Sequence, residues 1–184
     1  TGFPVFSSTL SRGMLPGPHP RNGGTIASLG ALPLAGIEPP DVVVLVGAAA
    51  GLLLGGRSFA ASVGGARVIQ LHVDPAEFGR LGPVDVAVQG DLAAALEGIA
   101  DRVGPRDVGS WAAQATAMKC LGDVLYEGAA MEADGIHPYR AAREIARAIP
   151  PGSVLVRDGG EAAAWIDWAV TDVDLGGVLA LGYQ

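Results

Sequence analysis

The stretch that decides the fold is Asp41–Val46, DVVVLV, which is followed directly by Gly47. A short run that is apolar on both faces is typical of a strand in a parallel sheet covered by helices. Similar short runs occur along the rest of the chain, each followed by a turn, and most then lead into helix-compatible sequence. They are Pro4–Ser8, Val68–Val73, Val84–Val88, Ser153–Val156 and Val178–Leu181. This alternation predicts an α/β fold with right-handed crossovers.

Two helices are marked by their first turns. Asp91 can cap a helix over Leu92–Arg102, and Pro138 stands at a first-turn position of an amphipathic helix that Pro150 ends. One face of this second helix is apolar, which predicts that it is buried. That face carries Tyr139, Ala142, Ile145, Ala146 and Ile149.

Glycine, proline and charge interrupt the pattern over Val103–Ser110. We therefore expect a first α/β domain over residues 1–104 and a linker over 105–135. The linker contains a helix predicted over Trp111–Ala130 and interrupted at Gly122. A second α/β domain is expected to begin within residues 136–184.

Composition narrows the possible functions. The 184 residues carry a net charge of −7 and one lysine, Lys119, which argues against a basic nucleic-acid-binding face. A single cysteine, Cys120, excludes an intramolecular disulfide and a multi-thiolate metal site. The longest apolar run, Val42–Gly56, is short for a membrane span, and no signal peptide is visible at the start. We expect a cytoplasmic protein without membrane contacts.

Strand ends provide the first candidate site. In an open parallel sheet, ligands bind at the carboxyl ends of the strands, where Gly47, Asp74, Gly90 and Asp91 are expected. Glycine lets a ligand approach the backbone, and a carboxylate can bind a ribose hydroxyl. The alternative is that the glycines make turns and Asp91 caps a helix. No GxGxxG motif follows the main strand.

A second candidate site is Asp158-Gly159-Gly160-Glu161, between a predicted strand and a predicted helix. Consecutive glycines let amide N–H groups converge on an anion at a helix start, which is a phosphate-binding geometry. A tight turn with a capping aspartate is the alternative.

No acid–base or metal-ligand constellation is found, so no catalytic residue and no metal ligand is assigned. Arg12 and His19 could face a ligand, but we interpret them as solvated loop residues. Trp165 and Trp168 lie three residues apart, a spacing more typical of a helix face packed in the core.

Taken in order, five segments resemble the thiamin-diphosphate-dependent enzymes of the acetolactate synthase type. The most specific is ARVIQLHVDPAEFGR, which is similar to that family's "IDIDPAEIGR" strand and turn. The others are PVFSSTLSRGMLPGPHP, PPDVVVLVGA, VDVAVQGDLAAAL and HPYRAAREIARAIPPGSVLVRDGGEAAAW. Together they cover nearly the whole chain in the family's order and spacing.

The resemblance implies a six-stranded Rossmann-like central domain, here lacking its first strand and helix, followed by the start of the thiamin-diphosphate-binding domain. Gly159, Gly160 and Glu161 match the loop that touches the cofactor's diphosphate. Positions near those that line a flavin dinucleotide in acetolactate synthases are Thr9, Gly47, Asp74, Gly90 and Asp91.

Departures from the family pattern bear on the cofactors. Ala48-Ala49-Ala50 stands where flavin users carry Arg and Asp, and His72 replaces an acid, so both changes argue against FAD. Glu161-Ala162 replaces the Gln-His pair common in acetolactate synthases. The GDG-x(n)-N signature, which holds Mg²⁺ in the family, does not occur. The family's catalytic glutamate does not occur either, so we expect a fragment that is inactive alone.

The leading hypothesis is therefore part of a thiamin-diphosphate- and Mg²⁺-dependent enzyme that decarboxylates or joins 2-oxo acids. The family's active sites form between two subunits, which implies a homodimer or homotetramer. The alternative is a Rossmann-like nucleotide-binding module without turnover. An NAD-dependent deacylase is a weaker third hypothesis, because it needs a catalytic histidine that nothing here supports.

Overall fold

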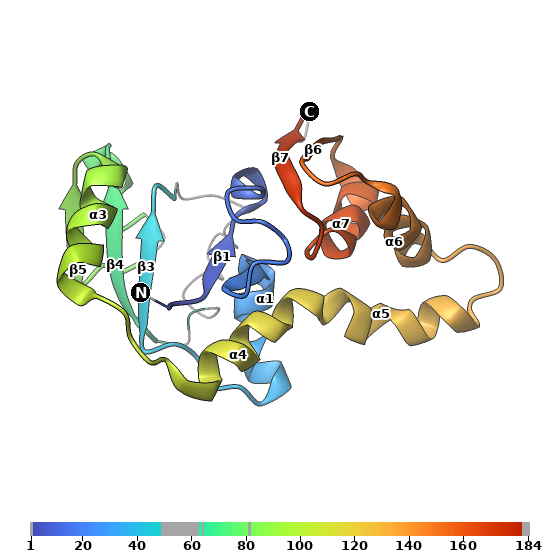
Figure 1. The fold of residues 1–184 in the computed structure, drawn as a ribbon, viewed down its shortest axis with the longest axis horizontal. Coiled ribbons are helices and arrows are strands. Elements are labelled where there is room, and N and C mark those ends of the chain that lie inside the picture. Colours follow the sequence, from blue (N-terminus) through green and yellow to red (C-terminus); the bar gives the residue numbers. More distant parts are fainter. Residues whose placement is uncertain (1, 49–62, 64, 81, 182–184) are drawn as a thin grey trace.

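The computed structural model describes residues 2–48, 63, 65–80 and 82–181. The chain forms an amino-terminal unit and a carboxyl-terminal unit, and a long helical segment runs along both (Figure 1). All of the strand pairs found among these residues are parallel, and helices or 3-10 turns follow most of the described strands. The predicted α/β class with a parallel, Rossmann-like arrangement is therefore confirmed.

The amino-terminal unit holds two sheets. β1 (Val5–Ser7) pairs with β2 (Asn22–Thr25), whereas β3 (Val42–Val46), β4 (Arg67–His72) and β5 (Val86–Gln89) form a second sheet in the order β3-β4-β5. Within the described part of this unit, five strands thus lie in two sheets, whereas the family resemblance implies one continuous sheet.

β2 is the strand that hydrophobic patterning misses. Its sequence, NGGT, contains no apolar residue, yet Asn22 is in register with Val5 of β1. Glycine is required here because a side chain at Gly23 would lie 2.5 Å from the ring of Phe6. This segment therefore forms a strand because its glycines allow close packing, and not because it buries apolar side chains of its own.

Short helices and turns complete this unit. A 3-10 turn, η1 (Thr9–Ser11), follows β1, and α1 (Ile26–Gly30) and η2 (Leu32–Ala35) precede β3. A further 3-10 turn, η5 (Pro75–Glu77), follows β4, and α3 (Leu92–Val103) follows β5. The core lies between β3, β4, α1 and the linker helix, and its buried residues include Leu29, Leu32, Leu45, Val68 and Met118.

The expectation that both faces of the main strand are covered is wrong for one face. Leu45 is buried, but Val44 and Val46 are 42% and 40% exposed. Alternate residues of a strand point to opposite faces. Among the described residues, the amino-terminal core packs against the face that carries Leu45, which accounts for the difference.

The linker helix is interrupted close to the predicted place. α4 (Gly109–Ala117) and α5 (Leu121–Glu132) are joined by a 3-10 turn, η6 (Met118–Cys120). Gly122 itself continues the helix and is buried. Glycine fits here because a side-chain carbon would lie 2.9 Å from the Tyr139 hydroxyl.

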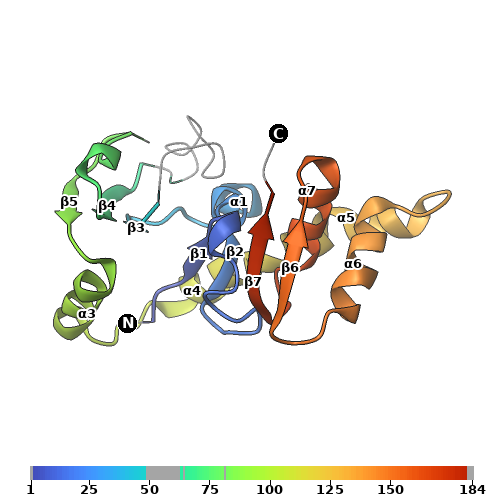
Figure 2. The same cartoon turned by 90° about the horizontal axis from the view of Figure 1, so that it is seen from above.

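The carboxyl-terminal unit consists of α6 (Pro138–Ala148), β6 (Ser153–Arg157), α7 (Gly160–Ala169) and β7 (Leu175–Ala180). Its core forms between the two helices and one face of the β6–β7 sheet, as Figure 2 shows from above. Tyr139, Ala142 and Ala146 are buried as predicted. Ile145 is 56% exposed, because it lies off the stripe that meets α7, so its predicted burial is wrong.

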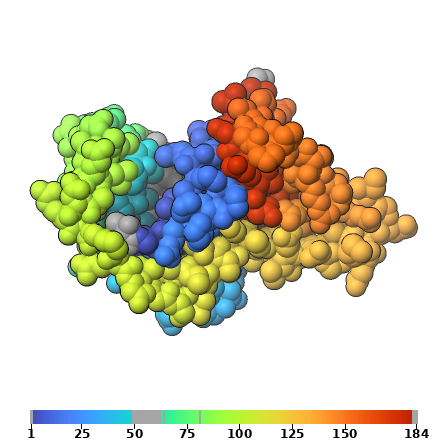
Figure 3. All heavy atoms as spheres, viewed as in Figure 1, coloured from blue at the N-terminus to red at the C-terminus, as the bar shows by residue number. Residues whose placement is uncertain are grey.

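The two units meet where the segment after η1 packs against β7. Gly13 lies so close to Gly177 that an added side-chain carbon would be 2.8 Å from the Gly177 backbone. In Figure 3 the amino-terminal segment, drawn in blue, is seated against the red strand of the other unit. None of the helices in the described ranges is both long and apolar enough to cross a bilayer. The predicted domain limits at residues 104 and 135 stay a prediction.

Candidate functional site

The strand-end residues of the three-stranded sheet do come together at one edge. Leu71 of β4 is in register with Val46 of β3, and His72 is in register with Gln89 of β5. Residues that follow these strands therefore share the carboxyl edge of the sheet. They are Gly47, Asp74, Gly90 and Asp91.

Local hydrogen bonds account for the side chains at this edge. The Asp91 carboxylate accepts a hydrogen bond from the Ala94 N–H at 2.9 Å and so caps α3. The Asp74 carboxylate accepts one from the Ala76 N–H at 2.9 Å and so caps η5. Both carboxylates therefore act as caps in the structure, and both remain exposed to solvent.

The two glycines make the turns that leave the strands. Gly47 has φ +59° and donates its N–H to the carbonyl oxygen of Leu71 at 2.9 Å. A side chain at this position would lie 2.7 Å from Leu92 at the start of α3. Thr9, the fifth predicted position, instead follows a strand of the other sheet, and its 3-10 turn packs against β7.

The second candidate site is the turn between β6 and α7. Gly159 is the N-cap residue, and its N–H donates to the Asp158 carboxylate at 2.7 Å. Gly160 begins the helix with φ +75°, a left-handed conformation that glycine adopts without strain. A side chain at Gly160 would meet no atom within 4 Å, so the approach to this turn is open.

This turn has the features of an anion site. The first N–H groups of a helix have no intrahelical acceptor, and the helix dipole favours negative charge there. The carboxylate of Glu161 lies in the same first turn, where it accepts a hydrogen bond from the Trp165 indole N–H at 3.0 Å. Backbone and space therefore fit a phosphate, and the two nearby carboxylates are already engaged in local hydrogen bonds.

A charged cluster lies directly beside this turn. Arg157, the last residue of β6, donates to the Asp158 carbonyl oxygen at 3.2 Å and lies 3.1 Å from the Asp167 carboxylate of α7. The third member is Arg12, from the amino-terminal unit, at 3.9 Å from the same carboxylate oxygen. The interpretation of Arg12 as a solvated loop residue is wrong, because its side chain is only 7% exposed.

The cluster is buried and carries one net positive charge. Burial lowers the pKa of the Arg12 guanidinium, although Asp167 opposes this shift. Burial raises the pKa of the Asp167 carboxyl, against the opposing effect of Arg12 and Arg157. Among the described residues, Arg12 Nε has no hydrogen-bond partner, and Arg157 Nε meets Asp167 as an ion pair without hydrogen-bond geometry.

Sequence patterning missed this cluster, although one signal for it existed. Asp167 is the only charged residue in the otherwise apolar stretch AAAWIDWAV, residues 162–170. A carboxylate on the buried side of a helix needs a cationic partner. The partner could not be identified from sequence, because Arg12 is 155 positions away.

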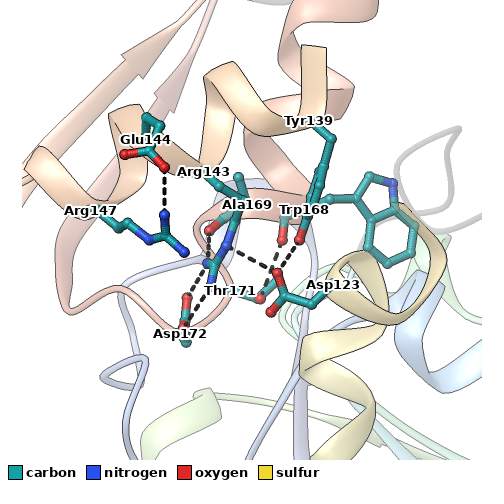
Figure 4. Close-up of polar contacts among 9 residues, drawn as sticks. All are labelled: Asp123, Tyr139, Arg143, Glu144, Arg147, Trp168, Ala169, Thr171 and Asp172. Atoms are coloured by element: carbon teal, nitrogen blue, oxygen red, sulfur yellow. Dashed lines mark hydrogen bonds and ion pairs between the residues drawn. The ribbon is translucent and has the colours of Figure 1, made fainter. Parts of the chain in front are cut away.

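A second polar network holds the linker helix to the carboxyl-terminal unit, as Figure 4 shows. Tyr139 donates its hydroxyl to the Asp123 carboxylate at 2.6 Å, and Arg143 lies 3.1 Å from Asp123 and 2.9 Å from Asp172. Burial and the hydrogen bond to Asp123 raise the pKa of Tyr139 above its usual range. The network joins α5, α6 and the residues after α7.

The remaining candidates have local roles. His19 accepts a hydrogen bond from the Arg21 N–H at 3.1 Å within its loop. Trp165 and Trp168 both pack against the second core, as their spacing predicts. Cys120 is half-buried, and burial raises the pKa of its thiol. Within the described ranges, His, Cys, Asp and Glu side chains form no group of three or more that could hold a metal ion.

Comparison with known proteins adds two findings. Residues 1–99, more than half of the chain, match the family described as thiamine pyrophosphate enzyme, central domain. The chain is also similar to the acetolactate synthase of Mycobacterium leprae (strain TN), with 33% identity over 104 residues. That match covers 52% of this chain and 15% of the relative, so the chain spans only a small part of the relative's length.

Proposed function

Because the chain belongs to the thiamine pyrophosphate enzymes through their central domain, we propose that it is part of a larger enzyme that decarboxylates or joins 2-oxo acids. The observation that carries this proposal is the order of its parts. A central-domain match over residues 1–99 is followed by a parallel βαβ unit whose first turn is open and glycine-rich. Similarity to an acetolactate synthase supports carboligation as the reaction type.

In this proposal the β6–α7 turn holds the diphosphate of thiamin diphosphate. The backbone N–H groups of Gly160 and Glu161, in the first turn of α7, would hold the diphosphate, and Gly159 is the N-cap residue of that helix. Bound thiamin diphosphate supplies the carbon–carbon bond chemistry, while the protein binds and orients it. The ligands of Mg²⁺ and the catalytic groups belong to parts of the enzyme beyond these residues, so the chain is inactive alone.

Partners and location follow from the same proposal. The substrate is a small 2-oxo acid, and the active site is completed by a second copy in a homodimer or homotetramer. The protein is cytoplasmic. FAD is not bound, because Ala48 follows Gly47 where a flavin user presents charged side chains. A purified intact protein should accordingly be colourless, and a yellow protein that releases flavin on denaturation would contradict this point.

The decisive experiment compares two glycines. Gly160→Ala and Gly152→Ala each place a side chain at a left-handed residue, with φ of +75° and +76°, and each side chain would meet no atom within 4 Å. Each should therefore cost about 1 kcal/mol of stability from backbone strain alone. Only Gly160 lies in the proposed diphosphate turn, whereas Gly152 precedes β6.

Thiamin diphosphate should be titrated into the intact protein with Mg²⁺ present, using tryptophan fluorescence to follow binding. Trp165 reports on the turn because its indole donates to Glu161. We expect Gly160→Ala to weaken binding at least tenfold, since it distorts the amides that face the anion, and Gly152→Ala to bind like the wild type. Equal affinities for both variants would refute this assignment.

A second candidate function is nucleotide binding without turnover. The observation that favours it is the convergence of Gly47, Asp74, Gly90 and Asp91 at one sheet edge. ADP and NAD should be tested by equilibrium dialysis against the intact protein. Micromolar binding that Asp74→Ala abolishes, together with no binding of thiamin diphosphate, would favour this candidate over the enzyme.

A further inference from the structure

The segment that follows η1 brings a buried cation against α7, the helix that begins at the proposed diphosphate turn. Arg12 belongs to the amino-terminal unit, but its side chain enters the carboxyl-terminal unit beside α7. Gly13 and Gly17 make this possible, because their missing side chains let the segment lie directly on β7 and on residues 172–173. The contact joins two units that are far apart in sequence (Figure 3).

A continuous chain of polar contacts leads from Arg12 to the turn. Asp167 of α7 lies 3.9 Å from Arg12 and 3.1 Å from Arg157. Arg157 then donates to the carbonyl oxygen of Asp158 at 3.2 Å, and the Asp158 carboxylate accepts the N–H of Gly159 at 2.7 Å. The two contacts of Asp167 are ion pairs without hydrogen-bond geometry, and the two contacts that follow are hydrogen bonds.

Burying the charged groups of this cluster costs desolvation free energy, which argues for a role other than stability. Its three side chains are 7%, 21% and 12% exposed for Arg12, Asp167 and Arg157. Two buried guanidinium groups share one carboxylate oxygen through ion pairs, and Arg12 Nε has no hydrogen-bond partner among the described residues. Apolar residues of similar size are often as stable as a buried ion pair or more so, and unsatisfied buried donors are uncommon in folded proteins.

We propose that Arg12 and Asp167 are positioning residues for the β6–α7 turn and that they act through Arg157. Arg12 orients Asp167, Asp167 orients Arg157, and Arg157 holds the Asp158 carbonyl, so that the amides of the first turn of α7 are fixed before an anion binds. The one positive charge of the cluster offsets part of the negative charge that Asp158 and Glu161 bring to that turn. This inference rests on the proposed function, because it names what prepares the diphosphate turn.

The test uses the intact protein and the variants Arg12→Met, Arg12→Lys and Arg147→Met. Arg147 also pairs with a carboxylate, Glu144, but that pair is on the exposed face of α6, with both side chains 62% exposed. We expect Arg12→Met to weaken thiamin diphosphate binding about tenfold, the lower end of what is lost when a group that orients ligand contacts is removed. Arg12→Lys should restore part of the affinity, and Arg147→Met should leave it unchanged.

Hydrogen exchange without cofactor provides the readout that a merely structural role would not move. The first hydrogen-bonded amides after the turn, those of residues 163–166 in α7, should exchange faster in Arg12→Met than in the wild type, whereas those within β7 should not. If Arg12→Met does not fold, Asp167→Asn replaces it, because it keeps the shape of the side chain and removes the charge.

Three outcomes decide the matter. Weakened binding with local acceleration of exchange at the turn supports the proposal. Binding of Arg12→Met equal to that of the wild type overturns it while leaving the proposed function intact. If the wild type binds no thiamin diphosphate, the proposed function fails, and unchanged exchange at residues 163–166 then overturns the positioning role as well.

Discussion

At the scale of single residues, the same carboxylate can cap a helix or bind a ligand, and its hydrogen bonds show which of these roles the structure uses. Asp91 illustrates this, because one carboxylate oxygen accepts the Ala94 N–H and thereby satisfies a donor that the helix cannot. Asp74 does the same for η5. The carboxyl edge of the sheet is therefore organised by its own caps, and a nucleotide would have to compete with them.

We predict that Asp91→Ala lowers the stability of the chain by about 1 kcal/mol, since it removes the N-cap of α3. Asp101→Ala is the matched control. Asp101 lies in the last turn of the same helix, where a negative charge opposes the helix dipole, so its removal should be neutral or slightly stabilising. Urea unfolding midpoints measure both effects. Equal midpoints for Asp91→Ala and the wild type would contradict the capping role.

At the scale of elements, a polar network adds to the apolar contacts that hold the linker helix. α5 buries Gly122 and Ala130 and packs Tyr126 against Tyr139 and Trp165. The network of Asp123, Tyr139, Arg143 and Asp172 adds charge-assisted hydrogen bonds, shown in Figure 4. How firmly this network holds the linker helix therefore depends on the protonation of Tyr139, whose hydroxyl donates to Asp123.

This dependence can be measured at alkaline pH. Because the pKa of Tyr139 is raised in the fold, the neutral phenol is favoured there, and its contribution to stability is complete below the ordinary tyrosine pKa. That contribution is lost as the pH rises beyond about 10, where unfolded tyrosine ionises. Urea midpoints of the wild type should fall with pH in this range, and those of Tyr139→Phe should fall less steeply.

Tyr126→Phe is the control for this experiment. Tyr126 packs against Tyr139 with ring centroids 5.5 Å apart, so the substitution changes the same aromatic cluster without removing the hydrogen bond to Asp123. At neutral pH, Tyr139→Phe should cost about 1 kcal/mol, the usual net value of one hydrogen bond. If the midpoints of Tyr139→Phe and the wild type fall in parallel above pH 10, the network does not act as described.

At the scale of the whole molecule, glycines determine how the two units meet. Gly17 is buried, and a side chain there would lie 2.3 Å from the carbonyl oxygen of Val173 and 2.4 Å from the backbone of Asp172. These are backbone atoms, which cannot move aside as a flexible side chain can. The Lys119 ammonium adds one polar contact, because it donates to the Gly17 carbonyl oxygen at 3.1 Å.

Gly17→Ala should therefore separate the amino-terminal segment from the carboxyl-terminal unit and cost about 1–3 kcal/mol, as overpacking does. Trypsin provides a local readout, because Arg12 is buried in the docked state and becomes a cleavage site when the segment leaves. Gly128→Ala is the control, since its side chain would meet no atom within 4 Å and alanine favours the helix α5. Protection of Arg12 in Gly17→Ala would show that the docking does not depend on this close approach.

Much of the fold could be predicted because local signals and tertiary packing agree. The strands at residues 42–46, 67–72, 86–89 and 153–157 coincide with β-branched runs, and α3 and α6 begin where Asp91 and Pro138 predict. The β6–α7 turn lies where DGGE predicts it, since two consecutive glycines after a strand favour a tight turn into a helix. β2 could not be predicted, because its sequence contains no apolar residue to form a pattern.

The sequence alone determined the α/β class, the family resemblance and the two glycine-containing edges, because each depends on residues that are close together in the chain. Tertiary structure alone decided that Arg12 is buried, that it shares Asp167 with Arg157, and that this cluster lies beside the β6–α7 turn. Such contacts join positions 12, 157 and 167, and a polar residue's burial depends on what packs over it. In this protein that covering comes from a glycine-lined segment of the other unit, which no local pattern reveals.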